Sequence, residues 1–195
     1  MRTLFRLFEQ NRAWAAKRVA ADPGYFGRLA RIQAPDNASI SHRYVAMAGD
    51  AAHHVGTSQI LQFTTWAAAD AKVGYGGIWA KESAPGFYRG STRYASASGR
   101  TAQATFKGVT DVAWVSTKAP NRGKAKVFID GSVVATVDLF APTLRRRQVV
   151  FTTALAVGEH TIKVKVLGSH RAGSSGNRVD VDALLGLHPA GVLNP

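Results

Sequence analysis

Cysteine is absent from the 195 residues of this sequence. The absence excludes disulfide bonds, thiolate zinc sites and cysteine nucleophiles together. Any metal site or catalytic site therefore has to use other side chains. The absence does not assign a compartment, because a β-sheet core of this size can be stable in an oxidising environment without crosslinks.

Long apolar runs are absent too. No segment approaches the roughly 18 apolar residues that a membrane-spanning helix needs. Residues 9–12, Glu-Gln-Asn-Arg, interrupt the N-terminus before the apolar region of a signal peptide can form. We therefore expect no membrane span and no signal peptide, and the chain as written begins like a cytoplasmic protein.

Acidic residues are few, with 12 Asp and Glu against 25 Lys and Arg and a net charge of +13. Such an excess is found in proteins that bind nucleic acid or anionic surfaces. Residues 1–36 carry 7 basic and 3 acidic side chains and residues 37–195 carry 18 and 9, so the excess is spread along the chain. We interpret the basic triplet Arg145–Arg147, which follows Pro142, as a solvated loop, because phosphate tracking needs a continuous stripe with stacking aromatic residues. The sequence thus disfavours nucleic acid as a partner.

Motifs for nucleophilic and phosphate chemistry are missing as well. There is no Gly-x-Ser-x-Gly elbow, and the segment 74–79, Gly-Tyr-Gly-Gly-Ile-Trp, is too short for a phosphate-binding loop and lacks its lysine. The sequence therefore predicts a protein that is not an enzyme and has no cofactor.

What the sequence does contain is a regular alternation of apolar and polar residues. Asp130-Gly131 tolerates the positive φ angles of a hairpin turn, and it joins two strand-like runs, Lys124–Asp130 and Val133–Asp138. In the first run alternate apolar residues share one face, namely Ala125, Val127 and Ile129. One apolar face and one mostly polar face predict an antiparallel sheet that a second sheet covers on one side.

Further strand-like runs follow at roughly ten-residue spacing from Trp66 onward. They are predicted at Asp70–Tyr75, Ala102–Lys107, Val112–Thr117, Arg147–Thr152, His160–Leu167 and Arg178–Leu184. Connections between them contain turn residues, among them Gly108, Pro142 and Gly158. Less regular runs, Arg43–Ala48 and Ser58–Thr65, precede them around a loop over residues 49–56.

Helix-like segments are missing between these strands, which excludes a parallel doubly wound sheet. The pattern predicts a mainly β fold. We expect an antiparallel two-sheet β-sandwich of the jelly-roll kind over residues 37–195, with regular strands from about residue 66.

The first 36 residues have a different pattern. Thr3–Ala20 places apolar residues three and four positions apart, and Asp22-Pro23 supplies an N-cap and a first-turn proline for a shorter helix over Gly24–Ile32. We expect a two-helix arm over residues 1–36. Because two such helices cannot bury their apolar faces alone, they dock on the sandwich, on a second copy of the chain or on a partner. Four aromatic residues favour oligomer contacts, namely Phe5, Phe8, Trp14 and Phe26.

Three short motifs stand within the arm: Asn-Arg-x-Trp from Asn11, Asp-Pro-x-Tyr-Phe from Asp22 and Gln-x-Pro from Gln33. In these motifs the segment resembles the N-terminal arm of bacterial β-class carbonic anhydrases, and the resemblance implies packing against a dimer partner. That family holds zinc through Cys-x-Asp-x-Arg and His-x-x-Cys. Since residues 36–50 contain neither motif, no zinc ligand carries over and a zinc lyase is the least favoured function.

A second series of motifs extends over residues 66–186. It consists of Tyr75–Trp79, Gly90–Ser96, Ala113–Gly131, Val137–Leu139, Gly158–Thr161 and Arg178–Leu184. In order and spacing the series resembles the β-sandwich modules at the ends of secreted actinobacterial proteins, which are similar to jelly-roll carbohydrate-binding modules. The resemblance implies a sandwich fold, an extracellular location, and a carbohydrate or cell-surface polymer as the partner.

A sugar site needs exposed aromatic faces and planar polar groups that fix hydrogen-bond directions. The loop-rich stretch Tyr75–Tyr94 and the loop before the hairpin contain both. We predict as ligand-binding residues Tyr75, Trp79, Tyr88, Arg89, Tyr94 and Arg122. The alternative for the aromatic residues is packing at the border of the core, and for Arg122 it is a brace to a carboxylate such as Asp138. We expect Trp114 in the core.

Asp180 and Asp182 share one face of a predicted strand. They could begin a structural calcium site or an acid–base pair. We favour the alternative that they pair across the sheet with Lys163, Lys165 or Arg178.

These observations predict a non-catalytic ligand-binding module whose ligand is a carbohydrate or cell-surface polymer. The alternative is a structural or assembly protein whose helical arm forms a homo-oligomer.

Overall fold

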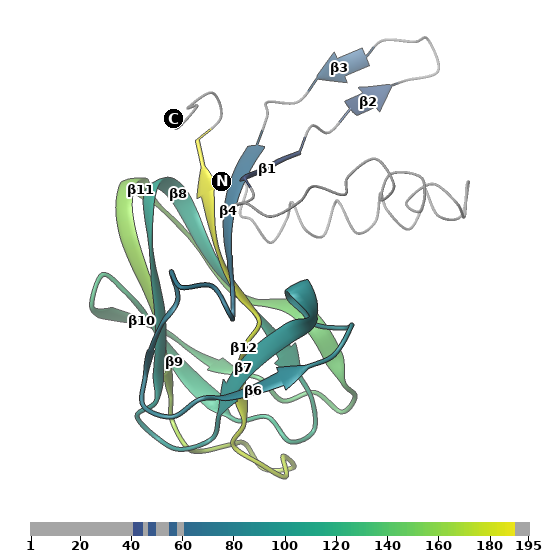
Figure 1. Cartoon of the computed structure of the whole chain (residues 1–195), viewed down its shortest axis with the longest axis vertical. Helices are drawn as coiled ribbons and strands as arrows, with labels where there is room; N and C mark the ends of the chain where they lie inside the picture. Colours follow the sequence, from purple (N-terminus) through teal and green to yellow (C-terminus); the bar gives the residue numbers. More distant parts are fainter. Residues whose placement is uncertain (1–40, 45–46, 50–54, 58–60, 190–195) are drawn as a thin grey trace. The chain divides into compact units, whose positions relative to one another are not determined.

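The computed structural model describes residues 41–44, 47–49, 55–57 and 61–189 (Figure 1). The helical arm predicted over residues 1–36 lies outside these residues, with its aromatic side chains and its oligomer contact. The domain boundary at residue 36 therefore stays a prediction.

The described residues form a mainly β structure in which every ladder between named strands is antiparallel. The elements are β1 (Ser41–Tyr44), β2 (Met47–Gly49), β3 (Val55–Thr57), β4 (Leu61–Ala67), β5 (Gly74–Gly76), β6 (Ala80–Ser83), the 3₁₀ helix η1 (Tyr88–Gly90), β7 (Ser91–Ala95), β8 (Thr101–Lys118), β9 (Lys124–Ile129), β10 (Ser132–Asp138), β11 (Arg145–Val166), β12 (Val179–Val181) and β13 (Ala183–His188). The predicted fold class, mainly β with antiparallel sheets, is confirmed. The jelly-roll topology stays a prediction.

The strands belong to one large and two small sheets. The large sheet has the order β1-β4-β13-β8-β11-β9-β10, with β5 paired to β8 beside this path. A three-stranded sheet has the order β12-β7-β6, and β2 pairs with β3.

The long strands β8 and β11 correct the sequence prediction. Ala102–Lys107 and Val112–Thr117 are one continuous strand through Gly108, which has a φ of 63°. In the same way β11 contains both strands predicted around Gly158, with register shifts on either side of that residue. Glycine in a strand can mark a bulge, where the strand bends without ending.

The basic triplet was also misplaced by sequence reasoning. Arg145–Arg147 forms the beginning of β11 and pairs with the end of β8 through Arg145 and Lys118, so it is not a loop. The three arginines have different surroundings, because a register shift between Arg145 and Gln148 and a φ of 53° at Arg147 interrupt the regular alternation of side chains.

The predicted hairpin is confirmed. β9 and β10 pair antiparallel, and Asp130 and Gly131 between them have φ angles of 50° and 84°, the positive values of a tight primed turn. The side chains of Ala125, Val127 and Ile129 are buried, as their alternation predicts. A register shift between Val133 and Ala135 interrupts the alternation in β10.

Two shorter segments differ from prediction. Asp70–Tyr75 is mostly a turn, in which the amide of Val73 donates to the carbonyl of Asp70 at 3.0 Å before β5 begins at Gly74. Arg178–Leu184 contributes to two sheets, because β12 belongs to the small sheet and β13 to the large one. Asp182 lies at this crossover and donates its amide to the carbonyl of Val115 at 3.0 Å.

The core combines side chains of the large sheet with side chains of the small one. Its members include Val112, Trp114, Val127, Ile162 and Val164 from the large sheet and Ala95, Val179 and Val181 from the small sheet. Trp114 is fully buried, as expected. Two sheets that share one apolar core form a layered β structure, and the polar groups described below lie where β12 approaches β8.

Candidate functional site

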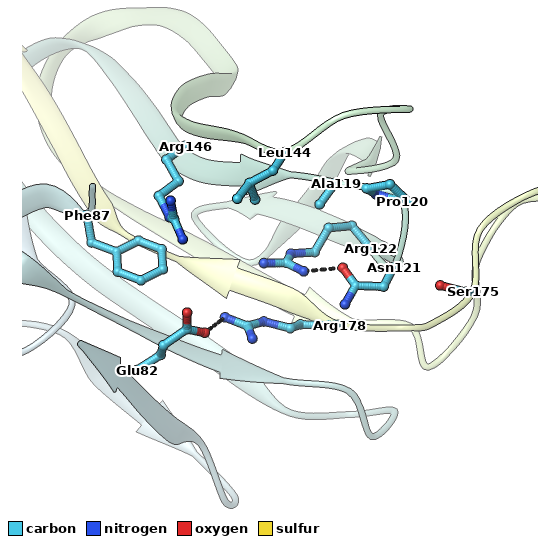
Figure 2. Close-up of a pocket in the computed structure, with 10 residues that line it drawn as sticks. All are labelled: Glu82, Phe87, Ala119, Pro120, Asn121, Arg122, Leu144, Arg146, Ser175 and Arg178. Carbon is cyan, nitrogen blue, oxygen red and sulfur yellow. Dashed lines mark hydrogen bonds and ion pairs between the residues drawn. The ribbon is translucent and has the colours of Figure 1, made fainter. Parts of the chain in front are cut away.

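An open pocket of about 460 Å³ lies where the loop before β9, the beginning of β11 and the segment before β12 meet. We call it the arginine pocket. It is lined by Glu82, Phe87, Ala119, Pro120, Asn121, Arg122, Leu144, Arg146, Ser175 and Arg178 (Figure 2). The lining thus combines three guanidinium groups, one carboxylate, one amide and several apolar side chains.

The segment Asn121-Arg122-Gly123 forms one wall because it approaches another segment closely. The amide of Gly123 donates to the carbonyl of Arg178 at 2.9 Å. A Cβ atom at Gly123 would lie only 2.5 Å from the carbonyl oxygen of Asn177, so a larger residue would push the two segments apart. The hydroxyl of Ser174 lies 2.8 Å from the carbonyl oxygen of Arg122 and holds the loop from the other side.

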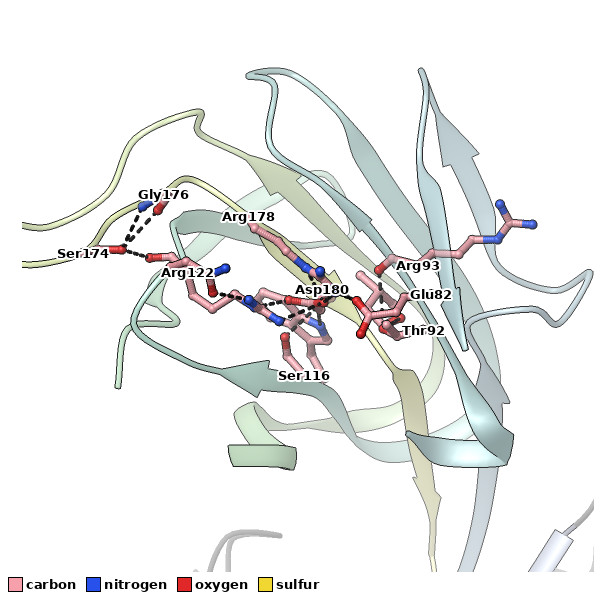
Figure 3. Close-up of polar contacts among 12 residues, drawn as sticks. Glu82, Thr92, Arg93, Ser116, Arg122, Ser174, Gly176, Arg178 and Asp180 are labelled. Carbon is pink, nitrogen blue, oxygen red and sulfur yellow. Dashed lines mark hydrogen bonds and ion pairs between the residues drawn. The ribbon is translucent and has the colours of Figure 1, made fainter. Parts of the chain in front are cut away.

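Asp180 organises the charged groups beneath the pocket (Figure 3). It is fully buried, its carboxylate forms an ion pair with Arg122, and it accepts a hydrogen bond from Nε of Arg178 at 2.9 Å. Arg178 also forms an ion pair with Glu82 at 2.5 Å. Burial raises the pKa of the Asp180 carboxyl, and the two guanidinium groups oppose this shift.

The backbone of Asp180 is anchored as firmly as its side chain. Its carbonyl oxygen accepts hydrogen bonds from the hydroxyl of Ser116 at 2.6 Å and from the indole of Trp114 at 3.2 Å. Two side chains of the large sheet therefore fix the strand that carries the carboxylate. Since both donors are buried, these hydrogen bonds are shielded from water.

The opposite side of the pocket is more apolar. The guanidinium carbon of Arg146 lies 5.0 Å from the centre of the buried Phe87 ring, a cation–π arrangement. Leu144, two residues before Arg146, is 51% exposed at the rim. Figure 2 shows the Arg146 guanidinium pointing toward Phe87 and the middle of the pocket.

Asp182 is a second buried carboxylate, outside the pocket lining. One of its oxygens accepts the amide of Tyr88 at 2.9 Å, and the other is buried with no hydrogen-bond partner among the described residues. Burial raises the pKa of Asp182 to about 6, although the Tyr88 amide and the charge of Arg147 favour the ionised form.

The structure brings only one of the six predicted ligand residues into the pocket lining. Arg122 lines the pocket and braces a carboxylate, which is Asp180 and not Asp138. Asp138 instead accepts the amide of Phe140 at 3.0 Å. The brace that sequence reasoning gave as the alternative is therefore present with a different partner.

Tyr75 and Trp79 pack together at the core. Their ring centres are 5.2 Å apart, Trp79 is 7% exposed, and the Tyr75 hydroxyl donates to the carbonyl of Ala68 at 2.9 Å. Burial raises the pKa of Tyr75. These contacts are those of residues packed at the border of the core, which was the alternative to sugar binding for these two rings.

The other three predicted residues lie on or next to the small sheet. Tyr88 and Arg89 are in η1, where Arg89 is exposed with a φ of 51°. The Tyr94 ring lies 3.7 Å from the guanidinium carbon of Arg178, so Tyr94 supports a pocket residue from behind. Ligand contact by these three side chains stays a prediction.

Sequence reasoning missed Glu82, Arg146 and Arg178 as members of one site. The signal for Arg146 was the basic triplet, and the signal for Arg178 was its place two residues before Asp180. Neither signal shows that the two arginines meet, because that depends on how distant strands pack.

A calcium site at Asp180 and Asp182 stays a prediction. Within the part of the chain that the structure describes, no three His, Asp or Glu side chains gather as metal ligands. Asp180 pairs with Arg178, which lies two residues earlier in the chain and not across the sheet, whereas Asp182 accepts the amide of Tyr88 and pairs with none of the three predicted cations among the described residues.

Two curated proteins of Flavonifractor plautii match about half of this chain. The A type blood N-acetyl-alpha-D-galactosamine deacetylase is 32% identical over 95 residues, which are 49% of this chain and 12% of that protein. The A type blood alpha-D-galactosamine galactosaminidase is 30% identical over 97 residues, which are 50% of this chain and 9% of that protein. The chain therefore spans only a small part of either relative.

Among solved structures, the family 35 carbohydrate binding module from Clostridium thermocellum aligns with 65% of this chain and 98% of its own, at 14% identity and a TM-score of 0.45. The chain matches none of the protein families with which it was compared. These values assign it to no family. The resemblance of the arm to carbonic anhydrases finds no support in the comparisons.

No helix within the described residues is long and apolar enough to cross a membrane.

Proposed function

We propose that the described domain is a non-catalytic carbohydrate-binding module and that the arginine pocket holds the sugar. The observation that carries the proposal is the match to two proteins whose names describe a deacetylase and a galactosaminidase that act on A type blood galactosamine. The matching stretch is 12% of one protein and 9% of the other. A segment of this size suits an accessory binding module better than a complete catalytic apparatus.

The composition of the pocket supports sugar as the ligand. Sugar rings have apolar C–H faces and directional hydroxyl groups, and they are bound by apolar side chains with a few fixed planar polar groups. The exposed Leu144 supplies an apolar side chain, whereas Asn121 and Glu82 supply an amide and a carboxylate group. The ion pair with Arg178 holds Glu82 in a fixed position, and Phe87 and Arg122 are buried lining residues that support these groups.

The same contacts argue against glycoside hydrolysis at this site. Most glycosidases use two carboxyl groups that flank the bond to be cleaved. Here Asp180 has no exposed surface, and Glu82 is ion-paired to Arg178 at 2.5 Å. The pocket therefore offers a single exposed carboxylate, which favours binding without cleavage.

A glycan panel tests the proposal on the full chain. The panel contains an immobilised A type oligosaccharide, galactan, xylan, mannan and polygalacturonate, and retention is measured by affinity gel electrophoresis and calorimetry. We expect at least one glycan to bind without release of reducing ends. Retention of none overturns the proposal.

Two serine variants assign the binding to the pocket. Ser175 is an exposed lining residue, so Ser175→Leu partly fills the pocket, whereas Ser132 is exposed on β10 outside the lining and makes Ser132→Leu the matched control. We expect Ser175→Leu to weaken binding and Ser132→Leu to leave it unchanged. Equal affinities of both variants and the wild type would place the sugar elsewhere.

A further inference from the structure

The arginine pocket has more positive than negative charge. Arg122, Arg146 and Arg178 line it, and the available carboxylates are Glu82 in the lining and Asp180 beneath it. Arg122 and Arg178 are the two guanidinium groups that these carboxylates engage. One cation is therefore in excess.

That cation is Arg146. Within the described residues no carboxylate or carbonyl oxygen accepts a hydrogen bond from its guanidinium group, and its Nε atom is buried without a partner. Its contact with the Phe87 ring holds the group but gives the Nε–H donor no acceptor. Other buried donors, such as Nε of Arg93, also lack partners, but Arg146 combines this cost with a place in the pocket lining and with no ion pair among the described residues, and together these point to a ligand.

The two neighbouring arginines differ from Arg146. Arg147 donates to the carbonyl oxygens of Phe87 at 2.7 Å and Pro85 at 3.2 Å, so its role in positioning the loop after β6 is clear. Arg145 is exposed and is not part of the pocket lining. Of the basic triplet, Arg146 alone combines pocket lining with a buried Nε–H donor that has no acceptor among the described residues.

We propose that the arginine pocket selects acidic saccharides and that Arg146 donates hydrogen bonds to the oxyanion of the bound sugar. The inference rests on the proposed function and adds the class of glycan. The oxyanion is the carboxylate of a uronate residue or a sulfate ester. A guanidinium group binds either through paired N–H donors, and such charge-assisted hydrogen bonds are among the strongest in proteins.

The rest of the molecule favours the same class of ligand. The exposed Leu144 beside Arg146 can contact the C–H face of a sugar whose charged group reaches the guanidinium. The net charge of +13 over the whole chain attracts an anionic polymer from a distance. Short ligands at physiological salt are therefore needed to separate recognition in the pocket from general attraction.

The test compares tetragalacturonate, a sulfated galactotetraose and neutral galactotetraose by calorimetry on the full chain in 0.15 M NaCl. We expect at least one acidic tetrasaccharide to bind more tightly than the neutral one. Arg146→Gln should weaken binding of that acidic ligand by about tenfold or more, the usual worth of a hydrogen bond to a charged group, and should lower the affinity for the neutral tetrasaccharide by a clearly smaller factor. Arg145→Gln removes the same charge one residue away and should change neither affinity.

A second variant moves Arg146 without removing its charge. A Cβ atom at Gly86 would lie 2.6 Å from Cδ of Arg146, so Gly86→Ala forces the flexible side chain out of its position. We expect the same selective loss of acidic binding in Gly86→Ala. Circular dichroism and the melting temperature verify that each variant is folded. If Arg146→Gln is unstable, Gly86→Ala still tests the role of the Arg146 side chain.

The outcomes separate the two proposals. The acidic ligand that binds distinguishes uronate from sulfate. Equal affinity for acidic and neutral tetrasaccharides, or equal losses in Arg145→Gln and Arg146→Gln, overturns the choice of acidic sugars and leaves carbohydrate binding intact. Failure of every tetrasaccharide and every polysaccharide in the wider panel overturns both proposals.

Discussion

At the scale of single residues, Asp180 supports the pocket from beneath through its contacts with Arg122 and Arg178. Its carboxylate is the counter-charge for Arg122, which is only 4% exposed. Removing one partner of a buried ion pair leaves the other charge buried without a counter-charge. The resulting loss of stability is larger than the stability that the intact pair contributes. The position of Arg122 in the pocket therefore depends on a residue that no ligand can reach.

We expect Asp180→Asn to lower the free energy of unfolding by about 3 kcal/mol, since it leaves the Arg122 guanidinium buried beside a neutral group. Asp138→Asn is the control, because Asp138 accepts a backbone amide that asparagine can also accept. Urea denaturation at neutral pH measures both variants. Equal losses in the two would contradict the assigned role of Asp180.

Asp182 contributes to stability with a pH dependence opposite to that of a carboxylate whose pKa folding lowers. Its pKa is about 6 in the folded protein, against an ordinary value of 3.8. Between these values the unfolded chain has lost the proton that the folded chain still holds. Stability from this group is therefore complete below the ordinary value and is lost as the pH rises through about 6.

We expect Asp182→Asn to remove this loss. Asparagine keeps the oxygen that accepts the Tyr88 amide but cannot ionise. Relative to the wild type, the variant should gain on the order of 2 kcal/mol of unfolding free energy between about pH 4 and pH 7. Denaturation curves at both pH values measure the difference, and parallel pH dependence of the two proteins would contradict the raised pKa.

At the scale of elements, the sequence predicts those features of the fold whose cause lies within a few neighbouring residues. The β9–β10 hairpin depends on a two-residue turn and on alternation within six or seven residues, and both are visible in the sequence. The continuity of β8 and β11 could not be predicted, because Gly108 and Gly158 serve equally well as turn residues and as bulges in a continuing strand. Only the pairing of the two strands distinguishes these roles.

The hairpin turn offers a clean test of backbone conformation. Gly131 has a φ of 84°, and a Cβ atom there would meet no other atom within 4 Å, so a substitution acts through the backbone alone. We expect Gly131→Ala to lower the free energy of unfolding by about 1 kcal/mol, because a residue with a Cβ atom is sterically strained in the left-handed region. Gly131→Asn should cost less, since asparagine tolerates this region. Thermal denaturation measures both, and a larger loss for asparagine would contradict the explanation.

At the scale of the whole molecule, the candidate site is a product of the tertiary fold. Phe87, Arg122, Arg146 and Arg178 come from four different segments, and the buried carboxylate decides which of the three arginines are paired. Sequence reasoning identified the fold class and one pocket residue, Arg122, whose loop stands next to a recognisable hairpin. It could not identify the unpaired arginine, because pairing between distant strands is not encoded in any local pattern.

The central claim is that sugar binds in the arginine pocket. The most direct measurement is a titration of the isotope-labelled full chain with a glycan that the panel retains, followed by amide chemical shifts in NMR spectra. We expect the largest shifts at Gly86, Phe87, Asn121, Arg122, Arg146 and Ser175. Shifts centred on the exposed Ile78 and its neighbours, or no shifts at saturating glycan, would contradict the central claim.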